Sequence, residues 1–196
     1  MGKLEFDIQN PENAIKLSFL LGNGQVVLIT SCDAQKKVHG ILTASWMTPT
    51  SHIPLLLTIS VGNGKEGSES ENYRASYKLI EDTAEFGLNI PTKELIEAVG
   101  KIGTVHSNQV DKYAETGLTA MESKMIKVNL IKECYLNIEC KVTDEYITGD
   151  HTVFVAEPAL VHINDDVLEN GIFSEKYRSK NNQIHFGDII DLWNMW

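Results

Sequence analysis

The chain has 196 residues, of which 42% are hydrophobic and 22% charged, and its formal net charge is −10. These values are typical of one globular domain with a full hydrophobic core and exclude a disordered or fibrous chain. The negative charge argues against binding to nucleic acid or anionic membranes, and no apolar stretch approaches the roughly 20 residues of a membrane helix.

The amino-terminal residues and the cysteines indicate the cellular compartment of the protein. Residues 1–7 lack the charged and apolar regions of a signal peptide, so we expect a cytoplasmic protein. Cys32, Cys134 and Cys140 form an odd set without Cys-x-x-Cys spacing, which favours reduced thiols over a disulfide framework. The six histidines lack the local spacing of a zinc site, so we expect no metal.

Three strands are predicted in the first third. Residues 25–31 are rich in β-branched side chains and follow the turn residues 22–24, which predicts a first strand. A second strand is expected after Gly40. Residues 55–61 form a third apolar run, bounded by Pro54 and by Gly62-Asn63-Gly64, with the length of a strand buried on both faces.

The middle of the chain predicts a loop and two short helices. Residues 65–72 are rich in Gly, Ser and Glu, which indicates a solvated loop. A helix over about 73–83 would turn one stripe toward the core, formed by Tyr73, Tyr77, Ile80 and Ala84. Residues 86–90 return as a strand, and Thr92 caps a second helix that ends near Gly100.

The last third is predicted to be β. Apolar and polar residues alternate over 136–143, and a neighbouring strand is expected over 151–163 with a bulge or an edge position at Pro158. Strands dominate and helices occupy the crossovers, which favours a barrel or sandwich within a single domain, residues 1–196. No internal repeat is visible.

Several familiar catalytic motifs are absent from the sequence. No Gly-x-Gly-x-x-Gly lies between a strand and a helix, because Gly22-Asn23-Gly24 precedes a strand instead. There is also no Gly-x-x-x-x-Gly-Lys-Ser/Thr loop and no Gly-x-Ser-x-Gly elbow. A Rossmann dehydrogenase, a P-loop nucleotidase and a serine hydrolase of the elbow type are therefore unsupported.

Three polar clusters stand where predicted elements end. Residues 43–49 combine hydroxyls with Trp46 and also fit a polar turn with a core tryptophan. Residues 103–108, followed by 110–113, carry small residues, hydroxyls and a cation, the ingredients of an anion-binding loop, and equally fit a solvated loop. Gly149-Asp150-His151-Thr152 alone is most simply a hairpin turn.

In this order the clusters resemble the flavin reductase-like family, in its flavoredoxin-like branch. The resemblance runs from about Gly24 to Ile163, with a tail over 167–196. The motifs that carry it are Leu42–Trp46 with Pro54-Leu55, Tyr77–Ile80, Glu85–Pro91, Val110–Tyr113, Leu136–Cys140 and Gly149–Glu157. The family's fold is a Greek-key, FMN-binding split β-barrel, mainly β with short helices. The resemblance implies a homodimer with one FMN per subunit near the interface.

Two positions depart from the family's pattern. Ser107-Asn108 stands where Ser-Gly is common before Val-Asp-Lys, although Asn also tolerates a positive φ. Gly40 stands where related proteins often have Asn, which removes one possible hydrogen bond to the flavin.

An FMN site must hold a doubly charged phosphate, cover a flat ring and stabilise the negative charge of the reduced flavin. By resemblance, Thr43 to Trp46 follow the ring and ribityl chain, Arg74 and Ser76 bind the phosphate, and Asn89 bonds the ring edge. The complete set of predicted cofactor-binding residues is Thr43, Ala44, Ser45, Trp46, Ser60, Arg74, Ser76, Asn89, Ser107, Asn108, Lys112, His151 and Phe186.

His151 is the candidate catalytic residue, because an imidazole at the ring can donate a hydrogen bond and change protonation near neutral pH. Phe186 is a candidate to cover the flavin of its own or the partner subunit. The predicted function is an FMN-dependent oxidoreductase that passes electrons from NAD(P)H or a protein donor to an acceptor. A flavoredoxin-like electron carrier without pyridine-nucleotide activity and a non-catalytic module that stores FMN or another ligand such as haem remain alternatives.

Overall fold

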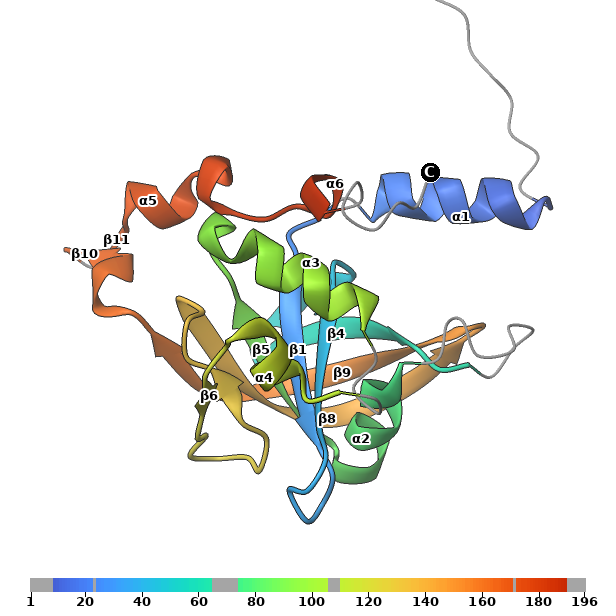
Figure 1. The fold of residues 1–196 in the computed structure, drawn as a ribbon, viewed down its shortest axis with the longest axis horizontal. Coiled ribbons are helices and arrows are strands. Elements are labelled where there is room, and N and C mark those ends of the chain that lie inside the picture. Colours follow the sequence, from blue (N-terminus) through green and yellow to red (C-terminus); the bar gives the residue numbers. More distant parts are fainter. Residues whose placement is uncertain (1–8, 23, 65–73, 106–109, 171, 190–196) are drawn as a thin grey trace, which may run out of the picture.

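The computed structural model describes residues 9–22, 24–64, 74–105, 110–170 and 172–189. Its centre is a seven-stranded antiparallel sheet in the order β2-β1-β5-β8-β9-β4-β3 (Figure 1). These strands are β1 (Val27–Cys32), β2 (His39–Ala44), β3 (Met47–His52), β4 (Leu55–Gly62), β5 (Glu85–Ile90), β8 (Leu136–Thr148) and β9 (His151–Ile163). The predicted mainly β fold with short helices is confirmed.

Smaller elements surround this sheet. Two separate two-stranded sheets pair β6 (Ala120–Met121) with β7 (Leu130–Ile131) and β10 (Leu168–Glu169) with β11 (Ile172–Phe173). The α-helices are α1 (Pro11–Leu21), α2 (Ala75–Thr83), α3 (Ile96–Thr104), α4 (Lys112–Thr116), α5 (Glu175–Arg178) and α6 (Phe186–Ile189). Three 3₁₀ turns add η1 (Lys93–Leu95), η2 (Asp165–Val167) and η3 (Lys180–Asn182). No described helix is long and apolar enough to cross a membrane.

Strand β1, the neighbour of edge strand β2, is buried on both faces and separates two apolar clusters. Val27 and Ile29 pack into the larger cluster, which also includes side chains of β4, β9 and α2. Leu28 points to the opposite face and joins the cluster under α3 and α6. This alternation is the period-2 geometry of a strand, and burial of both faces explains why residues 26–29 are all apolar.

The strands predicted from the apolar runs are confirmed, but β3 was missed. Residues 47–52 lack a strong apolar pattern because β3 is an edge strand with Thr48, Pro49 and Thr50 exposed. Proline is tolerated at an edge, where its missing N–H removes no ladder bond to a neighbour.

The helix predictions need correction in part. Helix α2 starts at Ala75, buries Tyr77 and Ile80 as expected, and ends at Thr83 as predicted. The following residue, Ala84, is exposed in a left-handed cap with φ of 54° rather than facing the core. The expected start at Tyr73 lies outside the described residues. Past Thr92 a 3₁₀ turn precedes α3, which continues beyond Gly100 to Thr104.

The β8–β9 hairpin matches the sequence closely. Its register shifts where Glu139 pairs with Leu160 and Cys140 pairs with Pro158, which is the predicted bulge at the proline. A two-residue turn joins Thr148 to His151, and Gly149 has a φ of 79°. A positive φ at the first central position is typical of a type II′ hairpin turn and explains the glycine.

Cys134 and Cys140 do not share a strand face. Cys134 precedes β8 and lies in the cluster under α3, whereas Cys140 lies on β8 in the larger cluster. All three cysteines are buried free thiols.

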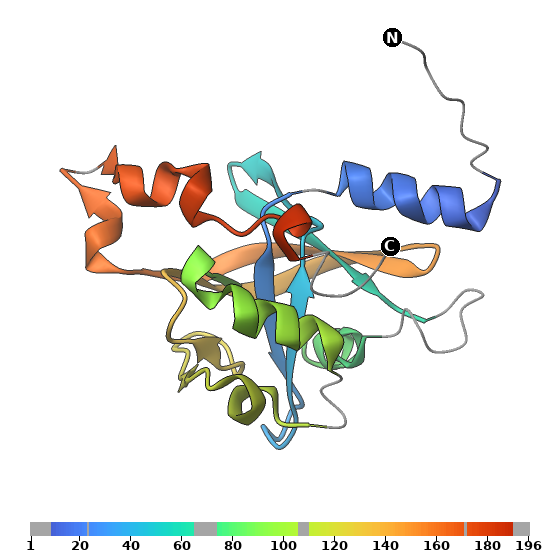
Figure 2. The same cartoon turned by 45° about the horizontal axis from the view of Figure 1, so that its top comes forward.

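The first and last helices are neighbours, because the carboxyl end of α1 lies next to α6 (Figures 1 and 2). Both views place α1 next to α6, along the same side of the molecule as α3 (Figures 1 and 2). The rings of Phe19 on α1 and Phe186 on α6 are 5.4 Å apart between centroids. Helix α1 was not predicted from the sequence, although Asn10 caps it by accepting from the N–H of Glu12 and Pro11 starts it.

Candidate functional site

A cavity of about 720 Å³ opens among elements from eight parts of the chain. Its walls come from α1, β2 with the following Ser45-Trp46, the end of β4, the start of α2, the end of α3 with Lys112, and the β8–β9 turn with Phe186. Strand ends and helix termini converge here, so polar backbone and side-chain groups meet an apolar wall. The cavity therefore has the composition of a ligand site.

Two cations, the buried Lys112 and the partly buried Arg74, face this cavity. Lys112 is 6% exposed, and its Nζ donates to the carbonyls of Ile41 on β2 at 2.9 Å and Ile102 on α3 at 2.7 Å. An ammonium has three N–H donors, so one remains for a ligand. Burial, followed by repulsion from Arg74, lowers the pKa of Lys112 to about 8.

Arg74 is the second cation and stands at the N-cap of α2. Burial lowers the pKa of its guanidinium. Among the described residues no carboxylate forms an ion pair with Arg74 or Lys112. Two desolvated positive charges without a described counter-charge favour an anionic ligand.

Hydroxyl groups lie beside these cations. Thr43, Ser45, Ser60 and Ser76 all line the cavity. Thr43 Oγ1 already donates to the carbonyl of Val99 at 2.9 Å, so it is left to accept from a ligand rather than to donate.

Gly40 lies under this cluster and matters by its missing side chain. A Cβ built there would lie 2.6 Å from Ser31 Oγ and 2.8 Å from Ser76 Oγ. Ser31 is 1% exposed, and its hydroxyl has no hydrogen-bond partner among the described residues. Gly40 thus leaves room for two hydroxyls to approach each other at the edge of the cavity.

An aromatic pair forms another part of the wall. The rings of Trp46 and His151 are 4.8 Å apart with an interplanar angle of 36°. His151 Nδ1 is 2.8 Å from Asp150 Oδ1, and both residues line the cavity. A carboxylate at Nδ1 favours a proton on that nitrogen and orients the ring.

Helices α1 and α6 contribute a further wall, of which the sequence predicted Phe186 on α6 but not the residues of α1. Ala14, Ile15, Ser18 and Phe19 line the cavity from α1, and Phe186 lines it from α6. A capping Asn10-Pro11 and apolar residues at 15 and 19, four apart, were the available signal for this helix.

The predicted site residues separate into three groups. The cavity brings together Thr43, Ala44, Ser45, Trp46, Ser60, Arg74, Ser76, Lys112, His151 and Phe186. Ser107 and Asn108 lie outside the described residues. Asn89 does not reach the cavity.

Asn89 is fully buried on β5 and serves the sheet instead. Its Nδ2 donates to the carbonyl of Leu28 at 3.0 Å, and its Oδ1 accepts from the N–H of Ile131 at 3.0 Å and from Asn137 Nδ2 at 2.8 Å. The sequence-based prediction that Asn89 contacts the edge of a flavin ring is therefore corrected. Its amide already makes hydrogen bonds inside the sheet.

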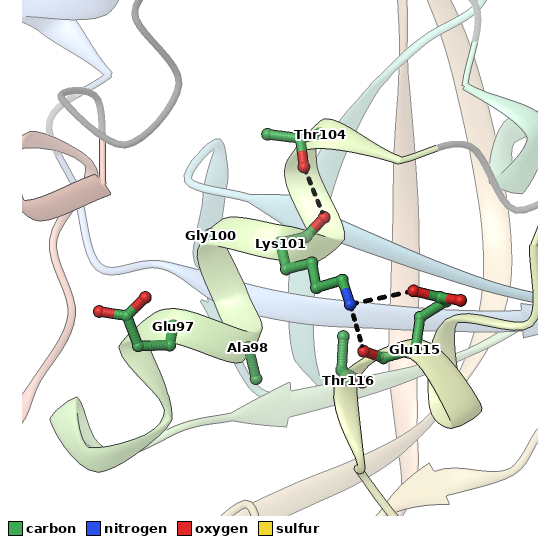
Figure 3. Close-up of a pocket in the computed structure, with 7 residues that line it drawn as sticks. All are labelled: Glu97, Ala98, Gly100, Lys101, Thr104, Glu115 and Thr116. Atoms are coloured by element: carbon green, nitrogen blue, oxygen red, sulfur yellow. Dashed lines mark hydrogen bonds and ion pairs between the residues drawn. The ribbon is translucent and has the colours of Figure 1, made fainter.

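A second, open hollow of about 430 Å³ lies between α3 and α4 (Figure 3). Its cation, Lys101, donates to the carbonyl of Glu115 at 2.6 Å and pairs with the Glu115 carboxylate at 2.9 Å. Because this charge is already neutralised, the hollow lacks the feature that distinguishes the larger cavity. The described residues also contain no group of three His, Cys, Asp or Glu side chains that could hold a metal ion.

The residues present fit a flavin mononucleotide. Lys112, Arg74 and the hydroxyl of Ser76 offer donors to a phosphate dianion, while Trp46 and Phe186 offer apolar cover to a ring. The partnerless hydroxyl of Ser31 next to Ser76 adds a further polar group at the same place.

Comparisons with known proteins agree with this geometry. The family model described as flavin reductase like domain matches residues 22–180. An uncharacterized protein of Archaeoglobus fulgidus is 38% identical over 132 residues, which are 67% of this chain and 68% of that protein. An uncharacterized protein of Pyrococcus abyssi is 30% identical over 131 residues, covering 67% and 70%.

Solved structures show the same fold. A putative flavin reductase with a split barrel domain from Shewanella frigidimarina has a TM-score of 0.74 at 15% identity, over 93% of this chain and 91% of that one. Flavoredoxin from Methanosarcina acetivorans has a TM-score of 0.70 at 18% identity, over 94% and 91%. The split-barrel architecture predicted from the motifs is confirmed.

Proposed function

The chain belongs to the flavin reductase-like family, and we propose that it is an FMN-dependent oxidoreductase whose cofactor occupies the cavity of about 720 Å³. The observation that carries the proposal is a pair of cations, the buried Lys112 and the partly buried Arg74, in one cavity with an aromatic wall and without a described carboxylate partner. A bound flavin supplies hydride and single-electron transfer.

The residues divide the work of such a site. Arg74, Lys112 and Ser76 neutralise and orient a phosphate through charge-assisted hydrogen bonds. Trp46 covers the ring and excludes water from it. His151, held at Nδ1 by Asp150, is the group placed to stabilise negative charge that develops on the ring and to hold a proton beside it.

The proposal is tested by flavin binding and by the source of electrons. Purified protein should show flavin absorbance or take up added FMN, and anaerobic addition of NADH or NADPH should bleach it. A colourless protein that binds no FMN overturns the proposal.

Arg74→Ala should weaken FMN binding about 10- to 100-fold, because a hydrogen bond to a charged group is worth about 1.5–3 kcal/mol. Binding of riboflavin, which lacks the phosphate, should change little. The matched control is Arg178→Ala on the exposed helix α5, away from the cavity. Equal loss of FMN and riboflavin binding in Arg74→Ala would contradict a phosphate at this position.

A flavoredoxin-like electron carrier is the second candidate. Flavoredoxins of Desulfovibrio vulgaris and Methanosarcina acetivorans are among the similar solved structures, and the net charge of −10 provides an attractive field for a basic redox partner. This version predicts reduction of the bound flavin by a reduced protein donor and no oxidation of either pyridine nucleotide. Steady oxidation of NADH or NADPH would exclude it.

We include in the proposal a homodimer with the flavin near the subunit interface, in the cytoplasm. Ile15 is 52% exposed and Trp46 is 37% exposed although both line the cavity, which supports a second chain covering its mouth. The buried thiols support a reducing compartment. A monomeric mass in sedimentation velocity with FMN bound would contradict the dimer.

A further inference from the structure

Asn63 is a buried asparagine that the sequence marked only as a turn residue, and it contacts the segment that carries His151. It follows β4 and is 3% exposed. Its Nδ2 donates to the carbonyl of Gly149 at 3.2 Å and to Thr152 Oγ1 at 3.1 Å. Its backbone N–H donates to the carbonyl of Asp150 at 2.9 Å. These bonds reach the chain on both sides of His151.

The β8–β9 turn is held from its inner side. Among the residues that the structure describes, nothing lies within 4 Å of a Cβ built on Gly149, so no described side chain packs against the outer side of the turn there. Thr152, by contrast, is fully buried, and its hydroxyl receives the Asn63 amide. The position of residues 149–152 above the cavity therefore depends on Asn63 in addition to the strand ladder.

The orientation of the His151 ring follows from this backbone. Asp150, whose carbonyl accepts from Asn63, also holds His151 Nδ1 at 2.8 Å, and Trp46 lies 4.8 Å from the ring. Groups that act on a reacting centre tolerate displacements of about 0.5 Å, and a misplacement of about 1 Å costs on the order of 100-fold. A loosened turn would move the imidazole by such amounts.

We propose that Asn63 is a positioning residue that fixes the β8–β9 turn and thereby sets the contact of His151 with Trp46 and with the flavin. The redox part of this inference rests on the proposed function; the structural part does not. Asn63 touches neither the cavity nor the reacting atoms, and it acts through His151.

Asn63→Ala and Asn137→Ala form a matched pair. Asn137 is also buried, at 4% exposed, and its Nδ2 also donates twice, to Asn89 Oδ1 and the carbonyl of Ile131, both at 2.8 Å. It lies outside the cavity, so its loss reports the cost of removing a buried amide and nothing of the turn.

The first readout needs no flavin. In flavin-free protein the ring proton resonances of His151, assigned with His151→Gln, should be displaced by the ring current of Trp46. Asn63→Ala should remove most of that displacement and Asn137→Ala should keep it. An unchanged His151 resonance in Asn63→Ala, or equal changes in both variants, overturns the proposal.

The second readout is the midpoint potential of bound FMN. Asn63→Ala should reduce the preference for reduced over oxidised FMN about tenfold, a shift of about 30 mV to more negative values for a two-electron couple, while affinity for oxidised FMN changes less than about threefold. If Asn63→Ala does not fold, Thr152→Val removes one of the two acceptors at nearly constant shape and should shift both readouts in the same direction. An unchanged potential in a variant that binds FMN refutes the redox part. Wild-type protein that binds no FMN refutes the proposed function instead and leaves the resonance test decisive for Asn63.

Discussion

Affinity for FMN should fall as pH rises through about 8, because one of the two cations in the cavity loses its charge there. Burial and, next, Arg74 lower the pKa of Lys112 to about 8 in the flavin-free protein. The second phosphate pKa lies near 6, so the phosphate remains a dianion throughout the window. Above pH 8 binding must therefore take up one proton or lose one charge-assisted hydrogen bond.

The linkage between proton binding at Lys112 and FMN binding sets the size of this loss of affinity. If bound phosphate keeps Lys112 protonated to pH 10, affinity falls by one log unit per pH unit and by roughly 100-fold between pH 7 and pH 10. For folding the sign is reversed. The ordinary lysine pKa is 10.5, so between about 8 and 10.5 the unfolded chain binds more protons, and flavin-free protein gains stability from this group as pH rises.

The assay is quenching of flavin fluorescence by titrated protein at pH 7, 8, 9 and 10. Riboflavin is the control ligand, since it has no phosphate and its affinity should stay nearly flat. Lys112→Arg is the control variant, because a guanidinium stays charged and should remove the step at pH 8. Parallel pH dependence of FMN and riboflavin, or an unchanged step in Lys112→Arg, would refute the assignment of the charge to Lys112.

Two further substitutions test the floor of the cavity and the opposite side of the sheet. Gly40→Ala should lower the free energy of unfolding in urea by about 1–3 kcal/mol and weaken FMN binding, because its Cβ would lie 2.6 Å from Ser31 Oγ and 2.8 Å from Ser76 Oγ. Unaltered stability would show that the hydroxyls of Ser31 and Ser76 can move apart. Glu139→Gln should cost about 2–4 kcal/mol, since the buried Glu139 carboxylate accepts from His162 Nε2 at 2.7 Å and from the N–H of Lys124 at 2.9 Å. Burial opposes ionisation of Glu139, but these hydrogen bonds outweigh it and lower its pKa, so wild-type stability should be lost as pH falls through the acid range and Glu139→Gln should flatten that loss. An acid unfolding curve identical in wild type and Glu139→Gln would contradict this account.

Much of the fold followed from local patterns because those patterns are produced by burial. The runs at 25–31 and 55–61 became β1 and β4, and alternation over 136–143 became the half of β8 that lies between β5 and β9. Edge strand β3 escaped because exposed Thr and Pro residues carry no alternation. Periodicity alone did not distinguish a barrel from a sandwich, and the order of the motifs identified the barrel.

The sequence predicted the cavity residues that lie at strand ends. It did not predict the residues whose role depends on hydrogen bonds to partners far away in the sequence. Trp46 and His151 are 105 positions apart, yet the family's motif order joined them, and their rings are in contact. Asn63 bonds Gly149, 86 positions away, which no local pattern encodes. Asn89 was misassigned for the same reason, because its register opposite Leu28 and Asn137 places its amide inside the sheet.

In the proposed site, the control of affinity would be separate from the control of potential. Lys112 and Arg74 would meet a phosphate charge that is constant through a redox cycle, so changing them should alter FMN affinity in both redox states alike. His151 would meet a charge that develops only on reduction, so changing its position through Asn63 should alter one state alone. A variant that combines Lys112→Arg with Asn63→Ala should therefore show the sum of two independent effects, because the ammonium contacts Ile41 and Ile102 whereas the amide contacts the β8–β9 turn. Strong coupling between the two substitutions would mean that one element moves both groups, and helix α2, which begins at Arg74 with its N–H bonded to the carbonyl of Gly62 beside Asn63, is the element positioned to do so.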